Sequence, residues 1–289
     1  MKSLKSTICY PDYTKDSIKG SYQSESGRKM VFCIVEAEDD IDVYGKFITD
    51  QVVIQPSNIA GRKSWHNVES IVSDLHNEFP GITLFGIRDS DYTRYTKYVC
   101  PPNIFLTDAR DLEMMMLHSR SVSSTLPEFK FADKITEAQE TTRFLGYLRI
   151  YNEVKQAKCI FRKNVANSKL MWDSKSRCVL PDYKDRQFNA FKSYCDSNPN
   201  CTISVTRIDF DEFLMQLQLP LEVCQYVCRG HDTIKILSFM LQGTPYGDRK
   251  TLQWHLAQSY SYSDFVKTEL YRSITDWASA KGFSVFINL

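Results

Sequence analysis

The sequence predicts an α/β protein in which a mostly parallel sheet is flanked by helices and followed by a mainly helical C-terminal half. Short apolar runs rich in β-branched residues alternate with amphipathic helical segments up to about residue 118. Beyond that position, segments with helical spacing of apolar residues follow one another. We therefore predict a polar lead-in over 1–28, a sheet domain over 29–118 and a helical region over 119–289.

Four short apolar runs are expected to form the strands of the sheet. They are MVFCIV at 30–35, QVVIQPS at 51–57, GITLFGI at 81–87 and NIFLT at 103–107. Two segments between them, 39–49 and 67–80, carry apolar residues at helical spacing. Because strands that alternate with helices are joined by crossover connections, these strands are expected to run parallel.

The C-terminal half is expected to contain four further helices with one apolar face each. They cover residues 136–157, 209–219, 232–242 and 261–282. The segment 177–200 shows no clear periodicity and is expected to be rich in loops. No internal repeat or low-complexity tract is visible in the chain.

The composition restricts the possible functions only weakly. Because 36 Lys and Arg residues balance 35 Asp and Glu residues, a nucleic-acid surface would have to come from a local basic patch. The nine cysteines are scattered without a C-x-x-C pair, which argues against a cysteine zinc site and favours reduced thiols. No apolar run is long enough for a membrane span and no signal-peptide core is present, so a cytoplasmic protein is expected.

Carboxylates follow three of the four predicted strands. They are Glu36 after the first strand, Asp89 and Asp91 after the third, and Asp108, Asp111 and Glu113 after the fourth. Ligands of open parallel sheets gather outside the carboxyl ends of the strands, and clusters of oxygen ligands suit Mg²⁺ or Mn²⁺. These acids therefore predict a metal site. Asp111 and Glu113 are equally expected if a helix begins there, because a helix N-terminus favours negative charge.

The order of these motifs resembles that of a Toprim domain, in which a glutamate ends the first strand and a D-x-D motif ends a later one. The segments VEAEDD, GIRDSDY, FLTDARDLEMMML and RGHDTIKIL resemble more closely a bacterial Toprim-related family encoded beside ABC-type ATPases in antiphage loci. This family includes the nuclease effector of the PARIS defence system. The resemblance extends over roughly residues 30 to 245 and depends on the order and spacing of the motifs.

The resemblance implies a Toprim-like sheet and a metal-dependent nuclease that cleaves phosphodiesters with Mg²⁺ or Mn²⁺. RNA, with tRNA as a candidate, is favoured over DNA. Glu36, Asp89 and Asp91 match the catalytic Toprim acids by position, and Asp40 matches a second acid of nuclease-type relatives. The expected metal ligands are Glu36, Asp40, Asp89, Asp91, Asp111 and Glu113.

The resemblance also implies a partner, an ABC-type ATPase that restrains the nuclease until infection. The apolar helices of the C-terminal half offer surface for that partner and for a homodimer. The segment SNIAGRKSW contains one glycine where many Toprim domains have a pair, and its Arg62 and Lys63 are candidate phosphate contacts. His231 and Asp232 in the GHD segment are either site residues or a structural histidine and a helix cap.

Two other functions are compatible with parts of the sequence. DSDYT also fits the D-x-D-x-T motif of haloacid-dehalogenase-type phosphatases, in which Asp89 would be the nucleophile and Asp91 the general acid. That motif normally closes the first strand of its fold, whereas here a strand ending in Glu36 precedes it. A Toprim fold that serves only as a binding subunit of an ATPase complex is the third hypothesis.

Overall fold

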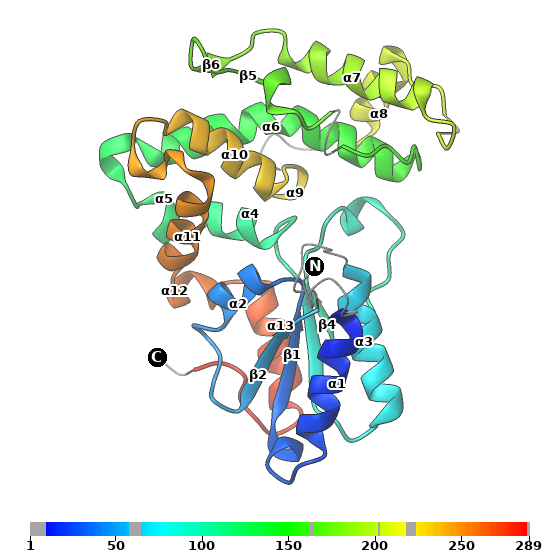
Figure 1. Cartoon of the computed structure of the whole chain (residues 1–289), viewed down its shortest axis with the longest axis vertical. Helices are drawn as coiled ribbons and strands as arrows, with labels where there is room; N and C mark the ends of the chain where they lie inside the picture. The colour runs from blue at the N-terminus through cyan, green and yellow to red at the C-terminus, as the bar shows by residue number, and fades with distance from the viewer. Residues whose placement is uncertain (1–9, 58–64, 162–164, 202, 218–223, 288–289) are drawn as a thin grey trace, which may run out of the picture. The chain divides into compact units, whose positions relative to one another are not determined.

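The computed structural model describes residues 10–57, 65–161, 165–201, 203–217 and 224–287 (Figure 1). The chain forms two compact units. Unit 1 comprises Met1–Ser90, Val99–Asp108 and Ser261–Leu289, and unit 2 comprises Asp91–Tyr98 and Ala109–Tyr260. Unit 1 contains the parallel sheet, whereas the described part of unit 2 is mainly helical.

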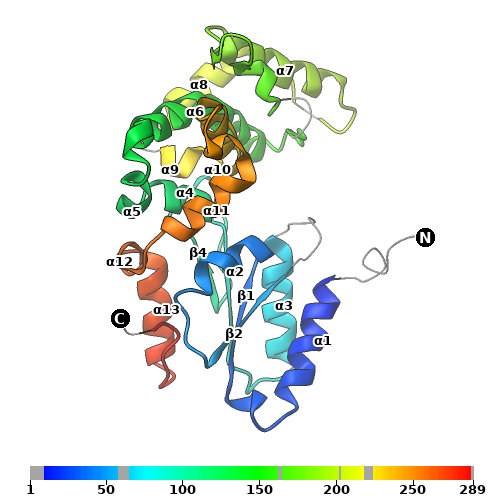
Figure 2. The ribbon, with the colours of Figure 1, turned by 60° about the vertical axis from the view of Figure 1, so that its left-hand side comes forward.

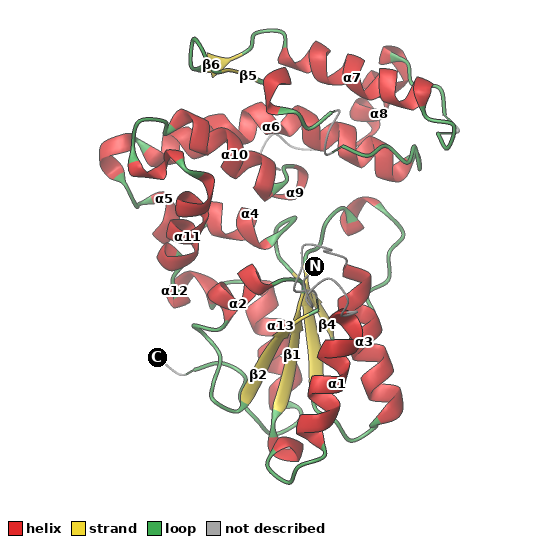
Figure 3. Cartoon of the chain, in the orientation of Figure 1, coloured by secondary structure: helices red, strands yellow, loops and turns green. Residues whose placement is uncertain are grey.

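Four parallel strands form the sheet of unit 1, in the order β2-β1-β3-β4 (Figure 3). The strands are β1 (Val31–Val35), β2 (Val52–Pro56), β3 (Leu84–Arg88) and β4 (Ile104–Leu106). Every residue of β1 and β3 is buried, as expected for central strands covered on both faces. The predicted strands and their parallel arrangement are confirmed.

Helices cover both faces of this sheet (Figure 2). The helices of unit 1 are α1 (Tyr10–Tyr22), α2 (Glu38–Tyr44), α3 (Trp65–Glu78), α12 (Tyr262–Phe265) and α13 (Glu269–Ser279). On one face, Ile18 of α1 and Ile71 of α3 share a buried apolar cluster with the strands. On the other face, the Trp277 ring of α13 lies 5.0 Å from that of Phe85. Asp108 caps α13 by accepting its first backbone N–H groups.

Two segments belong to unit 1 although the sequence analysis assigned them elsewhere. The helix α1 lies in the predicted polar lead-in, yet its Ile18 side chain is fully buried. The helix α13 lies in the predicted helical region, yet it packs on the sheet through Trp277. The two units therefore divide the chain at other positions than the predicted boundaries, because long-range packing joins α1 and α13 to the sheet.

The long helix α6 (Phe131–Val154) is the centre of unit 2. Four helices pack along it: α7 (Tyr183–Ser197), α8 (Arg207–Leu217), α9 (Cys224–Val227) and α10 (Gly230–Met240). The other α-helices described in this unit are α4 (Leu112–Leu117), α5 (Arg120–Ser123) and α11 (Arg249–Ser259). Aromatic rings hold α6 to its neighbours, since Tyr151 lies 5.4 Å from Phe210 and 6.1 Å from Phe191. The three helices predicted between residues 136 and 242 are confirmed within the described residues.

The helix α7 occupies the segment that was expected to be rich in loops, so that prediction is wrong. Its buried residues Phe188, Phe191 and Cys195 recur at helical spacing. Polar and charged residues fill the other positions and obscure this pattern. A short antiparallel pair, β5 (Trp172–Asp173) and β6 (Cys178–Val179), precedes the helix. In the described part of the chain, no helix combines the length and apolar character needed to cross a membrane.

Candidate active site

Glu36 lies directly after β1, at the carboxyl edge of the sheet. Because β1 and β3 are adjacent and parallel, their carboxyl ends meet at this edge. The Oε1 atom of Glu36 accepts the backbone N–H of Asp89 at 2.9 Å, and Glu36 is only 9% exposed. The ends of β1 and β3 therefore lie side by side, and the Glu36 carboxylate reaches the backbone of Asp89.

Asp40 lies one helical turn after Glu36, in the first turn of α2. Its Oδ2 atom accepts the backbone N–H of Ala37 at 2.8 Å. This bond satisfies a donor that the helix N-terminus leaves without an intrahelical partner. Asp40 therefore has a structural role at the helix N-terminus, in the same unit as Glu36 and Asp89.

Asp91 is engaged by an arginine in unit 2. Its Oδ1 atom lies 2.8 Å from Nη2 of Arg110, and its backbone N–H donates to the Arg110 carbonyl at 2.8 Å. The guanidinium also stacks on the Tyr92 ring, with 4.6 Å between its central carbon and the ring centroid. Asp91 has a left-handed backbone with φ of 44°, a conformation that aspartate tolerates better than most residues. The ion pair with Arg110 is therefore made by a residue in the left-handed backbone conformation.

Asp111 is a buried cap of the helix α4. One carboxylate oxygen accepts the Met114 N–H at 3.0 Å, and the other lies 2.5 Å from Nη1 of Arg110. The carboxylate also accepts the Gly230 N–H at 2.9 Å. Burial raises the pKa of Asp111, and the Arg110 guanidinium opposes that rise. The structure favours the helix-terminal role for this residue over the metal-ligand role.

Gly230 allows two helix N-termini of unit 2 to meet. A Cβ atom at this position would lie 2.3 Å from Cβ of Glu113 and 2.6 Å from Oδ1 of Asp111. Only a glycine fits this approach, because such distances are far shorter than van der Waals contact. The first residue of the GHD segment is therefore required by the packing of α10 against α4.

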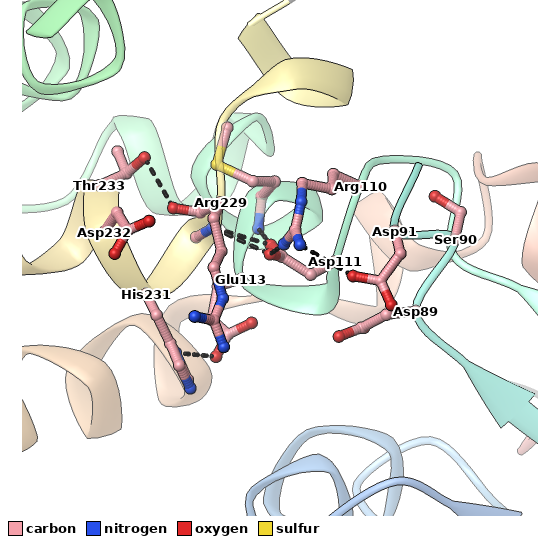
Figure 4. A network of polar contacts seen from close by, with 12 residues as sticks. Asp89, Ser90, Asp91, Arg110, Asp111, Glu113, Arg229, His231, Asp232 and Thr233 are labelled. Carbon is pink, nitrogen blue, oxygen red and sulfur yellow. Dashed lines mark hydrogen bonds and ion pairs between the residues drawn. The ribbon is translucent and has the colours of Figure 1, made fainter. Parts of the chain in front are cut away.

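The next three residues each bind a different side chain of unit 2, and Figure 4 shows the first of these contacts, between His231 and Glu113. Nδ1 of His231 lies 2.8 Å from Oε1 of Glu113, and both side chains are largely buried. Asp232 forms an ion pair with Arg149 at 2.8 Å. The hydroxyl of Thr233 lies 3.0 Å from that of Thr142. Asp232 is not a helix cap, because α10 begins after Arg229. Because His231 is bound to Glu113, it fits the alternative that it is a structural histidine.

The six predicted metal ligands are divided between the two units. Within the part of the chain that it describes, no group of three or more His, Cys, Asp or Glu side chains is arranged to hold a metal. The predicted ligands of unit 1 are Glu36, Asp40 and Asp89, and those of unit 2 are Asp91, Asp111 and Glu113. Arg62 and Lys63 lie outside the described residues.

Two buried arginines were missed by the sequence analysis. Arg110 pairs with two acids, and the side chain of Arg88, paired with Glu69, is only 1% exposed. Each arginine directly precedes an aspartate, in GIRD and DARD. An arginine that directly precedes an aspartate, at the end of an apolar strand or within a few residues after it, is therefore the signal that could have identified them.

No protein-family model matches this chain. A search of curated proteins finds no match either.

Proposed function

We propose that this protein is a metal-dependent nuclease in which Glu36 and Asp89 hold Mg²⁺ or Mn²⁺. The observation that carries the proposal is the 2.9 Å bond from the Asp89 backbone to the Glu36 carboxylate, at the ends of adjacent strands. This arrangement agrees with the order of acids in the Toprim resemblance. It also lies at the edge of the sheet where ligands of open α/β folds bind.

The donor chemistry at this edge fits a divalent metal. Mg²⁺ usually binds one or two carboxylates and keeps waters and substrate phosphates as its other ligands. Glu36 and Asp89 would hold the ion, and Asp40 is a further candidate in the same unit. Asp91 belongs to unit 2, where its carboxylate is ion-paired with Arg110. A bound metal would polarise the phosphodiester and activate the attacking water.

The substrate we propose is RNA, with tRNA as a candidate, and the role is that of a cytoplasmic antiphage effector. The test is to incubate purified protein with RNA and DNA pools, with Mg²⁺ and with a chelator. We expect RNA to be cleaved only when Mg²⁺ is present. If neither pool is cleaved with Mg²⁺ or Mn²⁺, the nuclease proposal is wrong. If only DNA is cleaved, the nuclease proposal stands and the substrate class changes from RNA to DNA.

The phosphatase alternative uses the same Asp89 in a different reaction. There, Asp89 would attack phosphorus and form an aspartyl-phosphate, while Asp91 would protonate the leaving group. A general acid needs a protonated carboxyl, whereas Asp91 is ion-paired with Arg110. We expect beryllium fluoride, which mimics the phosphoryl group, to leave no adduct at Asp89 in mass spectrometry. An adduct that is lost in Asp89→Asn would favour the phosphatase.

We further propose that an ABC-type ATPase binds this chain and restrains it, and that the chain forms a homodimer. The motif resemblance supports the partner. The helix α8 offers contact surface, since Ile208 and Met215 are 71% and 72% exposed and lie about two helical turns apart on one side. Overproduction of the chain alone is expected to be toxic, and co-expression with the neighbouring ATPase is expected to suppress toxicity and yield a stable complex.

Size-exclusion and pull-down experiments test the partner proposal. If the two proteins do not associate and toxicity is unchanged, the proposed control is wrong. If they associate but no metal supports cleavage, the hypothesis of a non-catalytic binding subunit is favoured.

A further inference from the structure

Arg88 is the last residue of β3, and its side chain lies in the interior of unit 1 with 1% exposure. Burying a guanidinium is costly unless it is paired and hydrogen-bonded. Its Nη1 atom lies 2.7 Å from Oε1 of Glu69, a residue of α3 whose side chain is 17% exposed. Its Nε atom donates to the backbone carbonyl of Asp89 at 3.0 Å. One guanidinium therefore joins the helix α3 to the backbone of a proposed metal ligand.

The backbone around Asp89 leaves the sheet at this point, because the pairing of β3 with β4 ends at Arg88. Beyond Arg88, side chains bind the backbone groups that strand pairing no longer binds. The Asp89 N–H is bound by Glu36, its carbonyl is bound by Arg88, and the Ser90 N–H donates to Oγ1 of Thr107 at 2.9 Å. Both peptide groups that flank the Asp89 Cα atom are thus held by named side chains. The direction in which the Asp89 side chain leaves the backbone is fixed by these bonds.

We propose that Arg88, held in place by Glu69, is a positioning residue that orients Asp89 for metal binding. The inference rests on the proposed nuclease function, because it assigns Asp89 to the metal. Arg88 acts through the Asp89 carbonyl. A lysine does not reproduce this arrangement, because its donors all lie on one nitrogen, whereas arginine uses separate Nε and Nη1 atoms for the carbonyl and the carboxylate.

A double-mutant cycle on Mn²⁺ binding tests the proposal. Mn²⁺ affinity is measured by calorimetry for wild type, Arg88→Lys, Asp89→Asn and the double variant. We expect Arg88→Lys to weaken Mn²⁺ binding by about 10- to 100-fold, as is typical when a partner that orients a metal ligand is removed. In the Asp89→Asn background the same change should cost less than about 3-fold, because the group it orients is no longer a carboxylate. For cleavage, kcat should fall while KM for the nucleic acid is unchanged.

Glu69→Gln is the second variant, in case Arg88→Lys does not fold. It keeps the size of the side chain, removes the charge that holds Arg88, and is expected to weaken Mn²⁺ binding in the same direction. Asp74→Asn is the matched control, because Asp74 is also an acid of α3 paired with a cation, here Lys15 at the surface. Its Mn²⁺ affinity should equal that of wild type.

The outcomes separate this inference from the function it rests on. If wild type binds Mn²⁺ and the folded Arg88→Lys and Glu69→Gln variants bind it equally well, the positioning role is wrong while the metal site stands. The positioning role would also be wrong if Arg88→Lys lowered Mn²⁺ affinity by the same factor in wild type and in Asp89→Asn. If wild type binds no Mn²⁺, the proposed metal site fails, and the positioning role fails with it.

Discussion

Asp89→Asn and Glu36→Gln are each expected to lower the Mg²⁺-dependent cleavage rate by about 10²- to 10³-fold or more. Each change removes one negative charge from the proposed metal site and keeps the size of the side chain. A glutamine at position 36 still offers a carbonyl oxygen to the Asp89 N–H group. Because one of two neighbouring negative charges is also removed, the melting temperature should change little. Single-turnover cleavage and thermal unfolding measure the two effects.

The matched control for these variants is again Asp74→Asn, which removes an acid of unit 1 away from the proposed site. It should retain wild-type cleavage, since a surface ion pair contributes at most about 1 kcal/mol to stability. Wild-type cleavage by both Asp89→Asn and Glu36→Gln would show that the reaction does not depend on these acids.

Gly230→Ala is expected to lower the free energy of unfolding by about 3 kcal/mol or more. At a solvent-exposed position inside a helix, the same change would increase stability, because alanine has the higher helix propensity. Here the new Cβ atom would lie 2.3 Å from Cβ of Glu113. To relieve this steric clash, α10 must move away from α4, which would break the hydrogen bond from Gly230 N–H to Asp111. Urea unfolding followed by circular dichroism measures the loss.

Gly20→Ala provides the control, because Gly20 lies inside α1 and nothing lies within 4 Å of a Cβ atom built there. That variant should be more stable than wild type by about 0.5–1 kcal/mol. If Gly230→Ala is as stable as wild type, the close approach of the two helices is not the reason for the glycine.

The sheet could be predicted because its strands are identified by local composition. β1 and β3 are buried on both faces, so each appears as a continuous apolar run. The packing of α13 on the sheet could not be predicted in this way. Its amphipathic pattern shows that one face is buried but does not show what covers that face. Trp277 reaches Phe85 across 192 positions of sequence, as their numbers show.

The candidate site could be predicted only in part, because an acid at a strand end has several possible roles. Glu36 accepts the backbone N–H of Asp89, because the ends of adjacent parallel strands lie side by side. Asp111 also follows a strand, but it caps a helix and binds Arg110. The sequence does not distinguish these roles, because they depend on which donor the fold brings to each carboxylate.

A crystal structure of the protein with Mn²⁺, measured at the manganese absorption edge, tests the central claim most directly. The anomalous signal locates the ion without reference to activity or substrate. We predict one Mn²⁺ bound by carboxylate oxygens of both Glu36 and Asp89, at the metal–oxygen distances of about 2.0–2.2 Å that small divalent ions adopt. Mn²⁺ at other residues, or no bound ion at millimolar Mn²⁺, would contradict the account.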